Sequence, residues 1–477
     1  MSETENRVPT HRKLAYASPA FALAVVGIPV YVYLPKFYTD TVGINIAYLG
    51  FILFSVRLFD AVTDPVLGRW SDRTRTRFGR RRPYIAAGAF FVALAMLMLF
   101  NPPRGSEALA TIWFGIWIYA LFLFWTVVTV PYESLGPEIT FNYDERTSLF
   151  AVRDGALIAG TLVAAASPAL VRWLFSIPEN PESERSVYFW ISVLYTPLII
   201  GACWWCVHAV REKVSGPQLS VHKSLWRDLR AIGYNKPFLI LLVSYTIAAI
   251  GNNLPATLIL YYVQYVILSQ NAEGFLMLYF VAGIVFLPAW IKISGKVGKK
   301  KAWLSSMAIN TGAFIGVFFL GPGDAVIYGI LVCLSGIGFG ATLALPSSIQ
   351  ADVIDYDELL TCQRREGQYV GLWNISKKLA AAVGVGAGLA ALGWAGYQPN
   401  VEQSERVVFT LRCLYAGVPS IFNLVALVIA LAYPIDSVIH DKIRKAVRTR
   451  KLGLEAEDPL KPGRILSDHI CKLRAIS

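Results

Sequence analysis

The stretch "SVRLFDAVTDPVLGRWSDRTRTRFGRRRPY", residues 55–84, decides the fold. It begins like the end of an apolar helix, yet it carries Arg57, Asp60 and Asp64 and continues into seven arginines between positions 69 and 82. Asp60 and Asp64 are one helical turn apart, so they share one face, with Arg57 on the same stripe. Buried carboxylates followed at once by a basic loop indicate a functional membrane span that ends at a charged surface.

The composition is that of a membrane protein. Hydrophobic residues make up 55% of the 477 residues and charged residues only 16%, where a soluble chain carries roughly a quarter. The mean hydropathy is +0.50. The net charge of +12 comes from basic residues in short loops between apolar runs, which favours an anionic membrane surface over nucleic acid as the partner.

The apolar runs are each about 20 residues long, enough to cross a bilayer core. They predict an all-α polytopic protein with twelve spans. The predicted spans are 14–36, 46–68, 83–101, 109–135, 149–172, 187–210, 236–266, 274–294, 302–320, 326–349, 367–392 and 410–433.

The loops predict the orientation. Segment 69–82 has its seven arginines against one acid, Asp72, and segment 295–301 has four lysines. The alternate loops "TDTVGIN" (39–45) and "SIPENPESE" (176–184) contain no Lys or Arg. By the positive-inside rule, we expect both termini to be cytoplasmic in a multi-pass protein of the plasma (inner) membrane.

The chain repeats itself. "FGRRRPY" at 78–84 matches "VGKKKAW" at 297–303, and "YDE" at 143–145 matches "YDE" at 356–358. Two matches at nearly the same offset predict duplicated six-span halves. Two parallel six-span halves are the plan of the major facilitator fold. The predicted divisions are a first bundle over 1–210, a cytoplasmic linker over 211–235, a second bundle over 236–435 and a cytoplasmic tail over 436–477.

Four segments together resemble the glycoside–pentoside–hexuronide:cation symporters, whose best-known member is melibiose permease. The longest is the opening stretch, which is similar to the family's helix II. "VPYESLGPEITFNYDERTSLFAVRDG" (130–155) resembles its helix IV to V segment. "NKPF" (235–238) and "ADVIDYDE" (351–358) with "SKKLAAAVG" (376–384) resemble segments of the second half. The resemblance implies cation-coupled symport of a sugar or glycoside by alternating access.

The resemblance also implies a cation site at Asp60, Asp64, Thr63 and Thr126, with Na⁺ or H⁺ as the coupling ion and no other cofactor or metal. Helical rise agrees, because Asp60, Thr126 and Lys378 all lie about 14 to 16 Å from the cytoplasmic ends of their spans. Lys378 and Arg57 are the predicted charge-balancing groups; the neighbouring Lys377 is a rival for the role of Lys378. The alternative is an internal ion pair, in which Arg57 or a lysine neutralises one acid merely to hold helices together.

The substrate site departs from that of melibiose permease. Leu23 and Ala24 stand where the family member has a Lys–Asp pair, and Thr129 replaces a helix IV aspartate. A sugar held in another way is therefore expected. The predicted substrate-binding residues are Trp125, Thr129, Glu133, Arg153, Trp373 and Asn374. For these the alternatives are helix packing by Trp125 and a mutual ion pair between Glu133 and Arg153.

The arginine loop is expected to tie helix ends together as a cytoplasmic gating motif. The predicted residues of this motif are Asp72, Arg73, Gly79, Arg80 and Arg81. The alternative is simple anchoring at anionic lipid, worth about 1 kcal/mol per basic residue.

An enzyme is not expected. The five histidines lie in loops, in tails or at a span end, and a nucleophile elbow, a P-loop and a dinucleotide fingerprint are all absent from the sequence. The expected partners are a small-molecule substrate, the coupling cation and the lipid bilayer, with the monomer as the functional unit. Two other functions stay open: cation-coupled transport of a lysophospholipid-like amphiphile, and a non-transporting membrane sensor.

Overall fold

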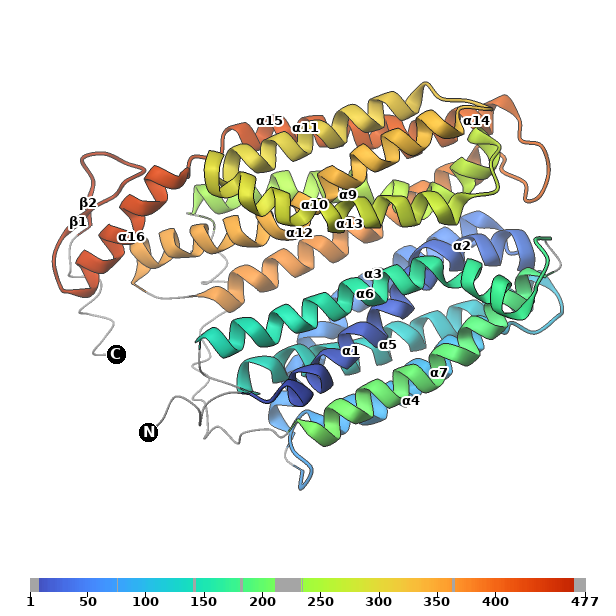
Figure 1. The fold of residues 1–477 in the computed structure, drawn as a ribbon, viewed down its shortest axis with the longest axis horizontal. Helices are drawn as coiled ribbons and strands as arrows, with labels where there is room; N and C mark the ends of the chain where they lie inside the picture. Colours follow the sequence, from blue (N-terminus) through green and yellow to red (C-terminus); the bar gives the residue numbers. More distant parts are fainter. Residues whose placement is uncertain are drawn as a thin grey trace. The chain divides into compact units, whose positions relative to one another are not determined.

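A computed structural model describes residues 8–466 apart from 75, 140–142, 181–182, 211–232, 234 and 363–364. The predicted linker therefore lies almost wholly outside the described residues. The described part of the chain is almost entirely helical, with one hairpin of two short strands, two residues each, near its end (Figure 1). In order along the chain, the first helices are α1 Thr10–Ile28, η2 Pro29–Tyr33, α2 Leu34–Lys36, η3 Phe37–Val42, α3 Ile46–Arg73, α4 Arg82–Leu99, α5 Glu107–Ile139, α6 Tyr143–Phe175 and α7 Glu184–Ala209.

The second part of the chain follows the same pattern of long helices. Its elements are α9 Lys236–Tyr262, η4 Val263–Ile267, α10 Ala272–Val297, α11 Lys299–Phe318, α12 Ala325–Thr361, α13 Glu366–Trp394, α14 Glu405–Arg412, η5 Cys413–Gly417, α15 Val418–Leu431, α16 Ser437–Lys451, β1 Ala456–Glu457 and β2 Ile465–Leu466. The two strands pair antiparallel.

Eleven helices in the described residues are long and apolar enough to cross a membrane. They match eleven of the twelve predicted spans, although the first runs on to Val42. The remaining prediction, 302–320, falls on α11, a 20-residue helix that begins with three lysines and is not among the eleven. The span count of twelve is therefore not fully confirmed. Large apolar side chains such as Trp173 and Trp394, 80% and 79% exposed, fit a surface covered by lipid.

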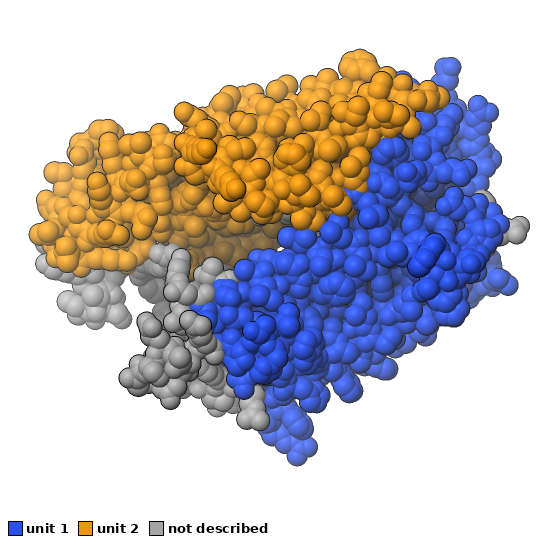
Figure 2. Space-filling model, viewed as in Figure 1, with its two compact units in different colours: residues 1–218, 256–277, 382–412 blue, residues 219–255, 278–381, 413–477 orange. Residues whose placement is uncertain are grey.

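The chain forms two compact units (Figure 2). Unit 1 contains residues 1–218, 256–277 and 382–412; unit 2 contains 219–255, 278–381 and 413–477. The units differ from a simple division at the linker, because one end of α9, the start of α10 and the second half of α13 belong with the N-terminal helices. The predicted division into bundles at 210 and 236 stays a prediction.

Glycines allow the helices to approach closely. A Cβ at Gly160 of α6 would lie 2.5 Å from the Phe21 carbonyl of α1, and one at Gly336 of α12 would lie 2.4 Å from the Tyr279 carbonyl of α10. Real side chains do not tolerate such distances, so each contact requires glycine. Small residues at helix crossings are the usual way in which membrane helices pack.

The first span is interrupted by prolines. Pro29 opens a π-helical turn and Pro35 lies in the short α2 that follows, after which η3 ends in a left-handed residue, Gly43 (φ +92°). The span formed by α9 and η4 ends in the same way, with a π-helical turn and the left-handed Leu268 (φ 57°). Proline lacks an amide donor, so widened turns and kinks are expected beside it. The two spans therefore end alike, and the predicted repeat of six-span halves stays a prediction.

Candidate functional site

The predicted cation residues Asp60 and Thr126 are brought together. Asp60 on α3 is only 6% exposed, and its carboxylate accepts a 2.9 Å hydrogen bond from the Thr126 hydroxyl of α5. The Thr63 hydroxyl donates to the Asp60 carbonyl at 3.1 Å, so it turns back onto its own helix. Asp64 follows one turn later and is half-buried. Asp60 and Thr126 thus lie at one level, as the helical rise predicts, and the cation site itself stays a prediction.

Arg57 lies against aromatic rings. Its guanidinium carbon is 4.1 Å from the centre of the Tyr31 ring and 4.9 Å from that of Phe122. Trp125 packs beside the same tyrosine, with ring centres 6.3 Å apart. A guanidinium held over two rings gains about 1 kcal/mol or more when desolvated, so its position is fixed without a carboxylate. Tyr31 was missed by the sequence analysis, because an isolated aromatic residue in an apolar span carries no pattern.

Gly27 leaves space beside this aromatic cluster. A Cβ there would lie 3.9 Å from the Tyr31 ring and 4.0 Å from the Trp125 ring. Thr129 follows Trp125 by one turn on α5, and its buried hydroxyl has no hydrogen-bond partner within the described part of the chain. A buried hydroxyl without a partner needs an explanation, and a water or a ligand is the usual one. Gly27, Tyr31, Trp125 and Thr129 therefore outline a candidate substrate cradle in unit 1.

The helix I position of the family's charged pair is closed by packing. Leu23 is 7% exposed, and a Cβ at Gly160 would lie 2.9 Å from the Cβ of Ala24. Leu23 and Ala24 thus lie where α1 packs closely on α6. Binding of the substrate without a helix I acid–base pair stays a prediction.

Glu133 and Arg153 both lie close enough to Tyr16 to act on it electrostatically. Glu133 is exposed on α5. The Arg153 Nε donates to its neighbour Asp154 at 2.8 Å, and its guanidinium carbon lies 4.6 Å from the centre of the Phe150 ring. Substrate binding by Glu133 and Arg153 stays a prediction, and so does the alternative of an ion pair between them.

The comparisons with known proteins agree with this geometry. A family model described as "MFS/sugar transport protein" matches residues 15–437. The chain belongs to this family. It is a transporter and not an enzyme, and its fold is the major facilitator fold.

Several curated relatives of this transporter are full-length matches. An uncharacterized symporter of Synechocystis is 26% identical over 92% of this chain and 96% of its own length. A glucuronide carrier protein homolog of Escherichia coli is 28% identical (88% and 91%), and an isoprimeverose transporter of Lactiplantibacillus pentosus is 26% identical (91% and 90%).

Solved structures share the fold of this transporter. A bacterial homologue of the iron transporter ferroportin in an inward-facing state has a TM-score of 0.64 at 15% identity, covering 89% of this chain and 98% of that one. A bacterial homologue of the lysosomal transporter Spinster has a TM-score of 0.58 at 14% identity, covering 92% and 96%.

The predicted residues of the second half lie on α13 in unit 2. Trp373 is 4% exposed and packs on Tyr245 of α9, with ring centres 4.1 Å apart. Asn374 is exposed, Lys378 is half-buried and Lys377 is exposed. Trp373 therefore packs within unit 2, and the roles predicted for Trp373, Asn374 and Lys378 stay predictions.

The arginine loop of the transporter is a compact turn. Gly79 has a φ of +108°, which favours glycine, and the Thr76 hydroxyl donates to its carbonyl at 2.5 Å. Arg73 is exposed and Arg81 is 7% exposed, with Arg80 between the two extremes. The side chain of Asp72 lies outside the described residues. Gating by this loop stays a prediction.

The opposite end of the helices carries a buried polar network that the sequence analysis missed. We call this end external and the end with the arginine loop cytoplasmic, following the positive-inside prediction. The Asp40 carboxylate accepts 2.7 Å hydrogen bonds from Tyr397 and Thr39. Asn400 donates to the Asp40 carbonyl at 2.7 Å, and Thr39 shares a 2.9 Å hydrogen bond with Tyr261. We call these five residues the external network; all of them belong to unit 1.

Tyr397 of this network stays a neutral hydrogen-bond donor. Burial, together with the nearby Asp40 carboxylate, raises the pKa of Tyr397 far above its ordinary value. Its hydroxyl therefore keeps its proton at every physiological pH and can always donate to Asp40.

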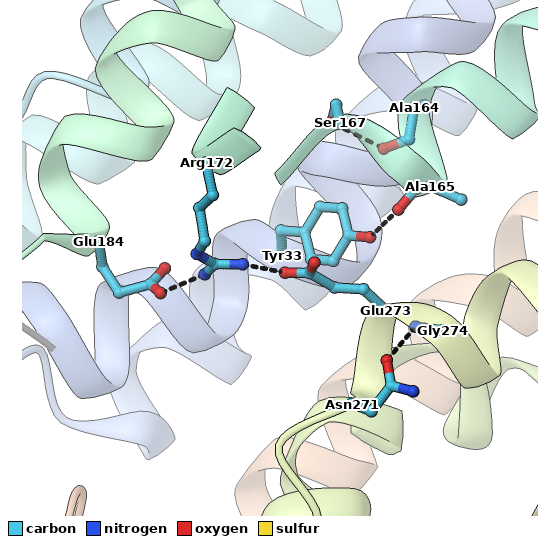
Figure 3. Close-up of polar contacts among 9 residues, drawn as sticks. All are labelled: Tyr33, Ala164, Ala165, Ser167, Arg172, Glu184, Asn271, Glu273 and Gly274. Carbon is cyan, nitrogen blue, oxygen red and sulfur yellow. Dashed lines mark hydrogen bonds and ion pairs between the residues drawn. The ribbon is translucent and has the colours of Figure 1, made fainter. Parts of the chain in front are cut away.

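A second external contact is the ion cluster of Arg172, Glu184 and Glu273 (Figure 3). Arg172, in the last turn of α6, donates to Glu184 of α7 at 2.5 Å and to Glu273 of α10 at 2.7 Å. In Figure 3 the guanidinium lies between the two carboxylates, beside Tyr33, whose hydroxyl donates to the Ala165 carbonyl at 2.6 Å. In the sequence these charges stand at span ends, where they look like ordinary loop residues.

Proposed function

We propose that this chain is a cation-coupled symporter of a sugar or glycoside that works by alternating access. One relative is named as a glucuronide carrier protein homolog and another as an isoprimeverose transporter, which supports a sugar-type small molecule. We also propose that one chain is sufficient for transport, in a plasma membrane with both termini in the cytoplasm.

The observation that carries the proposal is the buried Asp60 carboxylate bonded to Thr126. An ionised carboxylate is expensive inside a membrane, and a chain retains one there when it has a task. The Asp60 carboxylate and the Thr126 hydroxyl are oxygen ligands of the kind that a small cation uses. Asp64, about 6 Å further along the helix axis, supplies the second carboxylate.

Coupling follows from the charges. Without a cation, two carboxylates one turn apart repel each other. A bound cation offsets this repulsion and stabilises the cavity shape that also binds the substrate, so each ligand raises the affinity for the other. Lys378 offsets the acids when the cation leaves, which lets the empty carrier reorient without an uncompensated buried charge.

The substrate occupies the cradle formed by Gly27, Tyr31, Trp125 and Thr129. The two aromatic faces pack against the apolar face of a sugar ring, and the Thr129 hydroxyl gains a partner from a sugar hydroxyl. Because the Arg57 guanidinium packs on Tyr31, which also lines the cradle, a substrate in the cradle contacts a ring that is coupled to the helix that carries Asp60. The substrate and the cation would therefore both contact α5, and both would act on α3 through Arg57 and Asp60.

Alternating access then assigns a task to the external network and the ion cluster. Both join N-terminal helices to the external ends of α9, α10 and α13. These contacts close the external path, and the carrier opens outward when they separate.

The test is uptake by proteoliposomes of the purified chain. A panel of glycosides, acidic sugars and lysophospholipids is offered under a sodium gradient, under a proton gradient and with neither. We expect accumulation of at least one sugar under one cation gradient and its loss in Asp60→Asn and in Asp64→Asn, with downhill exchange partly retained. Accumulation of a lysophospholipid and of no sugar would show that the substrate is an amphiphile instead of a sugar.

The matched control is Asp441→Asn, which removes an exposed carboxylate outside the spans. It should transport like the unaltered chain. Normal accumulation by Asp60→Asn at normal membrane abundance would refute the assignment of Asp60. Poor folding of both aspartate variants, with low abundance, would instead favour a structural ion pair.

Orientation has a separate test. Arg77 is exposed in the arginine loop, so a cysteine in its place should react with an impermeant thiol reagent in inverted vesicles and not in intact cells. Labelling from outside would reverse the proposed topology.

A further inference from the structure

Residues 437–466, which follow the last span, form a folded cap. Helix α16 packs on α12, with Ile443 fully buried between them. The guanidinium of Arg450, only 6% exposed, donates to the Leu359 carbonyl. The fully buried Asp458 accepts hydrogen bonds of 3.3 Å from Tyr356 of α12 and of 3.0 Å from the Leu460 amide. These buried polar contacts fix which face of α16 is turned away from the protein.

The contacts also fix the level of α16 relative to the membrane. Leu431 is the last residue of the last span, and its carbonyl accepts a 2.9 Å hydrogen bond from Lys300 at the start of α11. The adjacent Lys299 pairs with Asp352 at 2.6 Å, and His440 of α16 lies 3.5 Å from the same carboxylate. The first turn of α16 is therefore at the level where the spans end, which is the level of the lipid headgroups.

The far end of α16 stays close to this surface. Arg450 reaches Leu359, which lies seven residues beyond Asp352 on α12 and so about 10 Å further along that helix. This distance is about one Debye length at physiological salt. In Figure 1, α16 runs obliquely across the end of α12 rather than extending it. All charges of α16 are thus within electrostatic reach of the headgroups.

The outward face of α16 is basic and partly apolar. Asp441 is the one acid among its fifteen residues. Val438 and Leu452, at and just beyond its ends, are 62% and 77% exposed and lie on the same side as Lys445 and Arg448. The exposed basic residues of the helix are Lys442, Arg444, Lys445, Arg448 and Lys451.

We propose that this face of α16 binds the anionic phospholipids of the membrane that the spans cross. Basic side chains flanked by exposed apolar ones are found on helices that lie in the interface of anionic membranes. Lysine and arginine side chains extend toward the phosphates while Val438 and Leu452 enter the acyl boundary. The proposal depends on the position of α16 at the membrane surface and not on the transported substrate or the coupling ion.

The test uses the full chain in proteoliposomes that contain a trace of photoactivatable phosphatidylglycerol or, in parallel, photoactivatable phosphatidylcholine. After irradiation, crosslinked peptides are mapped by mass spectrometry. We expect peptides from 437–454 to be labelled several-fold more by phosphatidylglycerol than by phosphatidylcholine. Equal labelling by the two lipids, or none from either while the arginine loop is labelled, would overturn the proposal.

The variant Lys445→Glu/Arg448→Glu should reduce the phosphatidylglycerol crosslink in 437–454 by roughly tenfold, because each basic residue contributes independently. The matched control is Arg104→Glu/Arg406→Glu, which reverses two exposed charges outside the cap and should leave the crosslink unchanged. Loss of the crosslink in both variants would mean that net charge, and not this face, attracts the lipid. Complete loss of the phosphatidylglycerol crosslink on addition of inorganic phosphate would show that the ligand of this face is free phosphate and not the membrane.

Discussion

The external and cytoplasmic ends of the transporter are held together by different kinds of contact. At the external end, Asp40 bonds a tyrosine 357 residues away, and Arg172 bonds a glutamate 101 residues away. At the cytoplasmic end of unit 2, the contacts join segments that are closer in sequence. Lys299 of α11 bonds Asp352 of α12, 53 residues away, and His440 of α16 bonds Asp355 of α12, 85 residues away. The Lys299 side chain is 37% exposed, whereas that of Arg172 is 15% exposed.

The difference in exposure predicts a difference in consequence. Breaking a buried pair leaves an uncompensated charge in a poorly solvated place, whereas breaking an exposed pair returns both groups to water. Contacts at the external end should therefore control the conformation of the carrier, and those of Lys299 should contribute little to its stability. Four variants test this contrast.

Arg172→Met should have the largest effect, because it leaves Glu184 and Glu273 facing each other without a cation. We expect a loss of about 3 kcal/mol from the closed external end. An impermeant thiol reagent added outside should then label a cysteine introduced at Thr129 at least tenfold faster than in the otherwise unaltered chain. The control is the single variant Arg172→Met without Thr129→Cys, in which any labelling comes from native cysteines. An unchanged rate would show that the ion cluster does not close the external path.

Tyr397→Phe should have the next largest effect. It removes one donor from the buried Asp40 carboxylate and keeps the ring, at a cost of about 2 kcal/mol. Thr39 still donates to Asp40, so the effect on external labelling at position 129 should be smaller than that of Arg172→Met. A larger effect would place the main closure at Asp40 instead of Arg172.

Gly386→Ala tests the helix packing at the same end. A Cβ at Gly386 of α13 would lie 2.7 Å from the Cβ of Phe54 on α3, so the helices must separate slightly, at a cost of about 1 kcal/mol or more. The melting temperature of the purified chain should fall. Gly115→Ala is the matched control, because nothing lies within 4 Å of a Cβ there. Equal melting temperatures for the two variants would argue against tight packing of α3 on α13.

Lys299→Met should have the smallest effect, below about 1 kcal/mol, because the Lys299 side chain is 37% exposed and the Asp352 carboxylate, itself 11% exposed, keeps His440 at 3.5 Å. The difference in melting temperature from the unaltered chain should shrink further as salt is added. A large, salt-independent loss would show that the cytoplasmic contact is as important as the external one.

The sequence predicted what depends on hydrophobic runs and on helical spacing. Eleven spans follow from the hydrophobic runs, and the meeting of Asp60 with Thr126 agrees with the helical rise. The transporter family was indicated instead by the resemblance of four segments, and the family model shows it. The span predicted at 302–320 falls on α11, which begins with three lysines and is not among the eleven.

Contacts that join distant segments had no such signal. Asp40 and Glu273 read as loop acids, and nothing in the sequence pairs them with Tyr397 or Arg172. Similarly, the tail after 436 read as basic and cytoplasmic, while its buried Arg450 and Asp458 depend on tertiary packing. Burial of a charged residue becomes visible only when its partner is located in three dimensions.

The π-helical turns η3 and η4 have a consequence for how the external end can release. A π turn holds one residue more than an α turn, so everything beyond it is rotated by about 100° relative to a regular helix. Return of η3 to α geometry would carry Asp40 around the helix axis and away from Tyr397, with the stem of α1 left in place. The first helix of each half can thus disengage by a change of local winding, a ratchet of one residue, instead of a tilt of the whole bundle.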